Sequence, residues 1–122
     1  MNFARNLSIA SLVACSLFVV SASADTGFPT GKYQAGHLTV NFGSDGRFQV
    51  IEDGKTVVEG TYRSDDAKLT ITDVSGAYAC PKDQASGTYG WRSEKSELTL
   101  KKIEDTCSDR SSDLDGHTLQ RQ

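Results

Sequence analysis

The sequence predicts an all-β fold, a small up-and-down antiparallel barrel of about eight strands. Along residues 31–121, apolar side chains recur with a period of two rather than about 3.6, which is typical of strands with one buried face. Turns rich in glycine, aspartate and serine separate these runs, so consecutive runs are expected to form hairpins. The chain leaves no room for crossover helices. A two-sheet sandwich is the main alternative architecture.

Four strands are expected in the first half of the domain. In "HLTVNF", Leu38, Val40 and Phe42 alternate on one face, and in "RFQVIE" the inward pattern continues with Phe48 and Val50. The segments "GSDG" and "DG" supply the turns that follow these two strands. The expected strands occupy residues 31–34, 37–42, 47–52 and 56–63.

The second half repeats the same pattern. "KLTITD" places Leu69 and Ile71 on one face, and "ELTLKKIE" does the same with Leu98 and Leu100. "GTYGWR" is expected to pair with "ELTLKKIE" around the turn "SEKS", and "HTLQR" is expected to close the sheet. These strands occupy residues 68–73, 87–92, 97–104 and 117–121.

Residues 1–24 are predicted to be a secretory signal peptide rather than part of the fold. Arg5 precedes an apolar stretch from Leu7 to Val20, and small residues in "SASA" predict cleavage before Asp25. The apolar run is short and interrupted by serine, so no membrane span is expected. "LVAC", ending at Cys15, resembles a lipoprotein signal, but the apolar "SLFVV" follows it. We therefore expect an exported protein, periplasmic or secreted, with lipid anchoring the less favoured alternative.

Residues 25–122 are predicted to form one small domain of 98 residues. It carries 12 basic and 16 acidic side chains and no basic run, so nucleic acid is not an expected partner. Its two cysteines are Cys80 and Cys107, and in an exported chain such a pair predicts one disulfide. No histidine or further cysteine lies close enough to either to suggest a metal pair.

Strand parity places both cysteines at the same end of the predicted barrel. In a meander, the connections after odd-numbered strands lie together, and two of these are long: residues 74–86, with Cys80, and 106–116, with Cys107. Three connections at the opposite end are tight, at residues 43–46, 65–67 and 94–96. We call the end with the long connections the mouth and the other the closed end.

If the alternation of inward-facing side chains is continued to the ends of the odd-numbered strands, charged residues fall at the mouth. Glu52, Asp73 and Lys102 fall there, and Arg110 in the second long connection could pair with Glu52 or Asp73. These charges are interpreted either as ordinary strand ends that discourage mispairing or as a polar collar above an apolar cavity. The aromatic residues are interpreted either as core or as pocket lining. The candidate ligand-binding residues are Glu52, Tyr62, Asp73, Tyr89, Trp91, Lys102 and Arg110.

No catalytic or metal-binding motif is recognised. A Gly-x-Ser-x-Gly elbow, zinc-spaced histidines and a phosphate-binding glycine loop are all missing from the sequence. His37 and His117 are isolated, and the acid-rich "DTCSDRSSDLDGH" (105–117) does not fit an EF-hand. We interpret that segment as a short solvated helix. We therefore expect no enzyme activity, no cofactor and no bound metal.

The chain resembles the lipocalin-like (calycin) barrels. Gly31-Lys32-Tyr33 is similar to their Gly-x-Trp start, and Arg121 stands where such barrels often place an arginine against that aromatic at the closed end. The segment "GTYGW…ELTLKKIEDTCSDRSSDL" is similar to a pattern in small exported bacterial lipocalin-like proteins. The matching residues are Gly87, Thr88, Tyr89, Leu98, Thr99, Leu100, Asp105, Cys107, Arg110 and Leu114.

This resemblance implies a barrel that carries a small hydrophobic molecule, although fold alone does not establish function. Our leading hypothesis is an exported binding protein that accepts a small apolar ligand at the disulfide-bridged mouth. The alternative is a protein-binding module or an inhibitor of proteases or lysozyme, acting through the bridged loops. "ACPKDQASG", with Pro81 and Lys82 beside the bridge, motivates that alternative. A third possibility is an envelope structural protein without a ligand.

Overall fold

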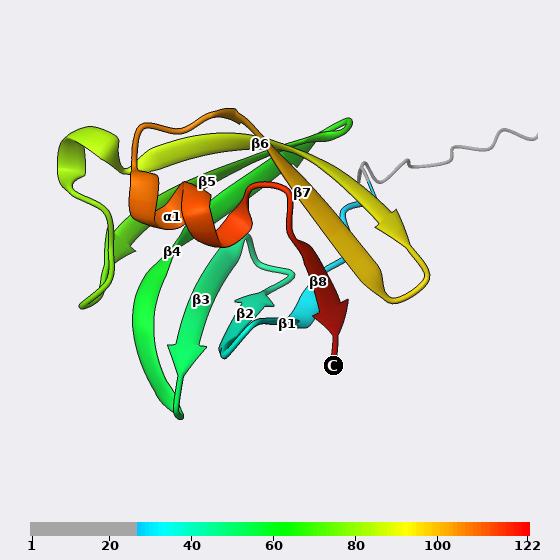
Figure 1. Cartoon of the computed structure of the whole chain (residues 1–122), viewed down its shortest axis with the longest axis horizontal. Coiled ribbons are helices and arrows are strands. Elements are labelled where there is room, and N and C mark those ends of the chain that lie inside the picture. The colour runs from blue at the N-terminus through cyan, green and yellow to red at the C-terminus, as the bar shows by residue number, and fades with distance from the viewer. Residues whose placement is uncertain (1–26) are drawn as a thin grey trace, which may run out of the picture.

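The structure, a computed structural model, describes residues 27–122 and forms a closed antiparallel barrel (Figure 1). Each strand pairs with its neighbours in sequence, and β8 closes the barrel by pairing with β1. The strands are β1 (Gly31–Ala35), β2 (Leu38–Phe42), β3 (Arg47–Glu52), β4 (Lys55–Asp65), β5 (Lys68–Ser75), β6 (Ser86–Glu94), β7 (Glu97–Glu104) and β8 (Thr118–Arg121). A 3₁₀ turn, η1 (Lys82–Gln84), follows β5, and one helix, α1 (Ser108–Leu114), follows β7.

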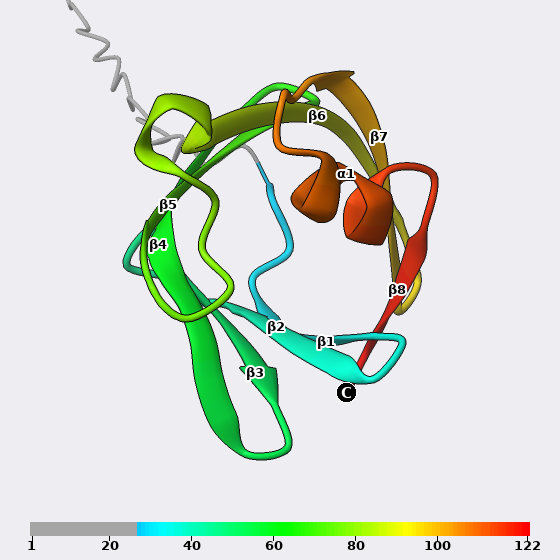
Figure 2. The same ribbon diagram turned by 60° about the vertical axis from the view of Figure 1, so that its left-hand side comes forward.

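The predicted barrel is confirmed, and the sandwich alternative is wrong. A single continuous sheet runs from β1 to β8 and returns to β1, and Figure 2 shows the strands surrounding the interior. The alternating side chains explain this closure, because one face of every strand supplies buried residues. Leu69, Leu98, Leu100 and Leu119 are fully buried, as the period-two pattern predicts.

Aromatic side chains fill the closed end. Phe28, just before β1, packs its ring 5.1 Å from Phe42 and 5.1 Å from Trp91, measured between ring centroids. Tyr62 lies 5.5 Å from Phe28 and 5.1 Å from Phe42. The tight turns at this end use left-handed backbone at Asp66 and Lys95. Rings from β2, β4 and β6, together with Phe28 from the segment before β1, therefore close this end of the barrel.

Gly31, Tyr33 and Arg121 meet at the closed end, as the resemblance implied. The Arg121 guanidinium lies 5.2 Å from the centroid of the Tyr33 ring, and it donates hydrogen bonds to the Tyr33 hydroxyl and the Thr30 carbonyl. Gly31 has φ +130°, and a Cβ placed there would lie 2.5 Å from Nη1 of Arg121. Glycine fits this position mainly because its φ is one that other residues rarely adopt, and a side chain here would also displace the end of Arg121.

The two long connections cover the mouth, and the predicted disulfide joins them. Cys80 and Cys107 are bonded, with Cα atoms 6.1 Å apart. Residues 76–85 and 105–117 thus form two linked segments at one end of the barrel, and α1 lies over the interior in Figure 2. No helix within residues 27–122 is long and apolar enough to cross a membrane. The expected signal peptide, including Cys15, lies outside the described residues.

Candidate ligand cavity at the barrel mouth

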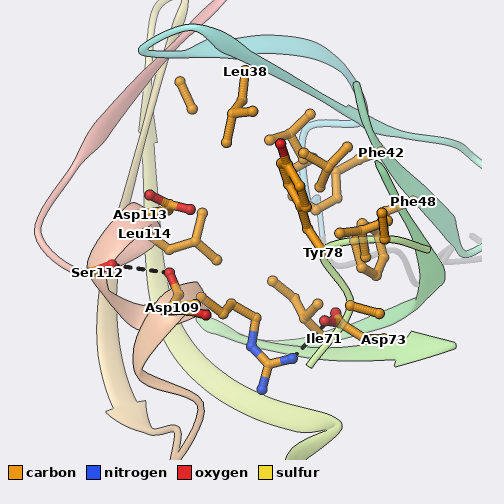
Figure 3. Close-up of a pocket in the computed structure, with 17 residues that line it drawn as sticks. Leu38, Phe42, Phe48, Ile71, Asp73, Tyr78, Asp109, Ser112, Asp113 and Leu114 are labelled. Atoms are coloured by element: carbon orange, nitrogen blue, oxygen red, sulfur yellow. Dashed lines mark hydrogen bonds and ion pairs between the residues drawn. The ribbon is translucent and has the colours of Figure 1, made fainter. Parts of the chain in front are cut away.

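A cavity of about 420 Å³ opens at the mouth, beneath α1 and the 76–85 connection (Figure 3). Its inner wall is apolar because the inward residues of β2 to β5 project into it. These side chains leave space near the mouth, whereas aromatic rings pack together at the closed end. The apolar lining consists of Ala35, Leu38, Val40, Phe42, Phe48, Val50, Val58, Ile71, Ala77, Ala79 and Leu114.

The polar lining is confined to the rim. Asp73 comes from the end of β5 and Tyr78 from the 76–85 connection. The other four polar residues, Asp109, Arg110, Ser112 and Asp113, all belong to α1. The cavity therefore combines an apolar interior with a polar entrance, an arrangement typical of small-molecule sites.

Arg110 lies at the centre of a buried charge network. Its Nε and Nη2 donate to the carboxylate of Asp105, at 2.7 Å each, and Nη1 lies 3.2 Å from Asp73. Nη1 and Nη2 also donate to the carbonyl oxygens of Ala85 and Gln84. All three guanidinium nitrogens are therefore engaged by protein acceptors, and the side chain is 6% exposed.

The same network shifts the pKa values of Asp105 and Tyr89. Burial alone would raise the pKa of Asp105, but hydrogen bonds from Arg110, Tyr89 and the Cys107 amide hold that pKa below its usual value. Burial, followed by its hydrogen bond to Asp105, raises the pKa of Tyr89 far above the usual value. Asp105 therefore stays ionised, and Tyr89 stays a neutral donor.

Tyr78 links the 76–85 connection to the opposite rim. Its hydroxyl donates to Oε1 of Glu52 at 2.7 Å, and Nε2 of His37 lies 2.8 Å from Oε2 of the same carboxylate. The hydrogen bond to Glu52, more than any other effect, raises the pKa of Tyr78. The ring of Tyr78 lines the cavity while the residue remains 56% exposed.

Two aspartates of α1 lie at the entrance without an ion pair to any residue of the described chain. Asp109 and Asp113 are both exposed and both line the cavity. Partial desolvation raises the pKa of Asp113. His37 opposes this effect, the negative charge of Asp109 raises the pKa further, and His117 makes the smallest contribution, which lowers it.

The structure brings together only part of the predicted site. Asp73 and Arg110 line the cavity, and Arg110 pairs with Asp73 rather than Glu52. Glu52 lies at the rim, held by Tyr78 and His37. The remaining predicted residues, Tyr62, Tyr89, Trp91 and Lys102, are not part of the lining.

These four residues are elsewhere for separate reasons. Tyr89 is fully buried behind Arg110, and Tyr62 and Trp91 belong to the closed-end cluster. Lys102 is exposed, because inward alternation in β7 stops after Leu100 and the β6–β7 register shifts between Thr88 and Tyr89. The inward parity therefore does not extend to the end of that strand.

Sequence reasoning missed Tyr78, Asp109 and Asp113 as lining residues. It also treated Asp105 as part of a solvated helix, which is wrong, because its side chain is fully buried against Arg110. The short helix itself is confirmed. The spacing of Asp109 and Asp113, one helical turn apart, was the available signal that both face the same way.

Comparison with protein families, curated proteins and solved structures finds no match to this chain. The closed eight-stranded antiparallel barrel is consistent with a lipocalin-like fold. Within residues 27–122, no group of three or more histidine, cysteine, aspartate or glutamate side chains is arranged to hold a metal ion.

Proposed function

We propose that this protein is an exported binding protein that holds a small, mainly apolar molecule in the cavity at its mouth. The observation that carries this proposal is the cavity itself, about 420 Å³ with an apolar interior. Ligand sites generally occupy about 300–1,000 Å³ and combine apolar walls with a few polar groups.

Binding rather than catalysis fits the chemistry of the lining. The cavity contains no cysteine, serine–histidine pair or histidine, and its arginine is held by carboxylates and carbonyls. The proposed role is therefore to remove an apolar molecule from water, a process driven by about 0.8 kcal/mol for each buried methylene group.

A series of straight-chain alcohols tests this proposal. Each added methylene is expected to strengthen binding about fourfold until the chain fills the cavity. Isothermal titration calorimetry on the protein from residue 25 onward measures that series. The variant Val50→Trp, which fills the cavity, is expected to abolish binding. Val74→Trp, on an exposed position of β5, is the matched control and should bind as the wild type does. No binding of any alcohol would refute the proposal.

A second candidate function is a protein-binding or inhibitory role of the bridged loop. Pro81, Lys82 and Asp83 are exposed next to the disulfide, which favours a rigid contact surface. Assays of lysozyme and of a panel of proteases with the purified protein test this candidate. Replacing Lys82 with Ala should weaken inhibition without changing alcohol binding, and an absence of inhibition throughout the panel would eliminate it.

A further inference from the structure

The charges at the cavity entrance are unbalanced. Three aspartates and one arginine are the charged residues among those lining it, so the entrance carries an excess of negative charge. The carboxylate of Asp73 is compensated by Arg110 and accepts a hydrogen bond from the Cys80 amide. Asp109 and Asp113 form no ion pair within residues 27–122, and the only opposing charges that act on Asp113 are those of His37 and His117.

Arg110 is not available to bind an anionic ligand. Its three nitrogens already contact Asp105, Asp73 and two carbonyl groups, as described above. A carboxylate entering the cavity would therefore gain no free guanidinium donor, and it would approach Asp109 and Asp113. Like charges brought together in a partly desolvated site repel each other.

The pair of carboxylates is also unfavourable for α1, although Asp109 alone lies in the first turn, where the helix dipole favours a negative charge. Asp109 and Asp113 are four residues apart, where like charges destabilise a helix. Asp113 lies in the last turn, where the helix dipole disfavours a negative charge. A bound cation would relieve both effects. The ring of Tyr78 lies across the cavity from Asp113 (Figure 3) and offers a surface that also favours cations.

We propose that the ligand is a cationic amphiphile, an inference that rests on the proposed binding function. Its apolar part would lie inside the barrel, and its amine or quaternary ammonium group would lie beside Asp109 and Asp113. The apolar part would contact the inward residues of β2 to β5, and Phe42 and Phe48 mark the depth to which it can extend. The charged end would remain at the entrance, where it keeps part of its hydration.

Three probes that share one alkyl chain test this inference: decyltrimethylammonium, decanol and decanoate, each titrated calorimetrically at mildly alkaline pH and low ionic strength. The cation is expected to bind at least about tenfold more tightly than decanol, and decanoate more weakly than decanol. Added salt is expected to weaken binding of the cation and leave decanol unchanged, because partly exposed charges are screened.

The double variant D109N/D113N is expected to lose about tenfold in affinity for the cation and none for decanol. The control D65N/E94Q makes the same change in net charge at exposed closed-end positions, and it should bind all three probes as the wild type does. Equal affinity of the wild type for decanol and the cation would overturn the inference and leave the proposed function standing. An equal loss in the control would also overturn it. Failure of all three probes to bind would refute both.

Discussion

Arg110 joins segments of the chain that are distant in sequence. It contacts Asp105 before α1, Asp73 at the end of β5, and the carbonyls of Gln84 and Ala85 before β6. A buried guanidinium in this position is tolerated only because each nitrogen has an acceptor. The arginine therefore defines how both connections lie over the cavity, in addition to the disulfide.

Replacing Arg110 with Met is expected to lower the free energy of unfolding by about 3–5 kcal/mol, because two carboxylates would remain buried without a counter-charge. Urea denaturation followed by circular dichroism measures the loss. The control Arg92→Met removes an exposed arginine from β6 and should change stability by less than about 0.5 kcal/mol. Similar losses in the two variants would mean that the network contributes no more than a surface charge.

Asp105 predicts the response of the fold to acid. Hydrogen bonds from Arg110 and Tyr89 overcome the effect of burial and place its pKa in the folded state below the usual 3.8. The corresponding stabilisation is fully present above that usual value and is lost as pH falls through the lower, folded-state pKa. Equilibrium unfolding at a series of acidic pH values should therefore show a decline that is shallower in Asp105→Asn. A variant with the same pH dependence as the wild type would contradict this assignment.

At the scale of elements, the disulfide connects the 76–85 connection to the start of α1. Cys80 and Cys107 are separated by 27 positions in the sequence. Replacing both with Ser is expected to reduce the free energy of unfolding by about 3–4 kcal/mol, because the unfolded chain gains conformational freedom. Denaturant unfolding of this variant, compared with reduced wild-type protein, measures the effect. A loss below about 1 kcal/mol would show that the connections are held mainly by Arg110.

The elements themselves could be predicted because their information is local. Alternation in segments such as "HLTVNF" identifies a strand from neighbouring residues, and the count of strands then gives the barrel. Strand parity similarly placed Cys80 with Cys107. Parity failed at Lys102, where a register shift and the end of alternation depend on the partner strand. The alternation within one strand does not determine its register with the partner strand.

The site could be predicted less well, because its residues are assembled by loops. Asp105 stands in an acidic, serine-rich segment whose composition indicates exposure, yet it pairs with an arginine five residues later. Tyr78 reaches Glu52 across 26 positions. Such contacts follow from the path of the connections over the mouth, and composition does not determine that path.

The two ends of the barrel differ, and this difference predicts at which end a ligand enters and slows hydrogen exchange. Aromatic rings close one end, whereas the mouth is covered by connections with few strand hydrogen bonds. Local opening should therefore be easiest at residues 76–85 and 108–114. Hydrogen exchange with and without decanol measures this: binding should slow exchange in those two segments and leave the hairpins at 43–46 and 94–97 unchanged. Cavity-filled Val50→Trp protein is the control, and it should show no ligand effect. Protection centred on the closed-end hairpins instead would mean that the ligand enters through the aromatic cluster, so the mouth would not be the binding entrance.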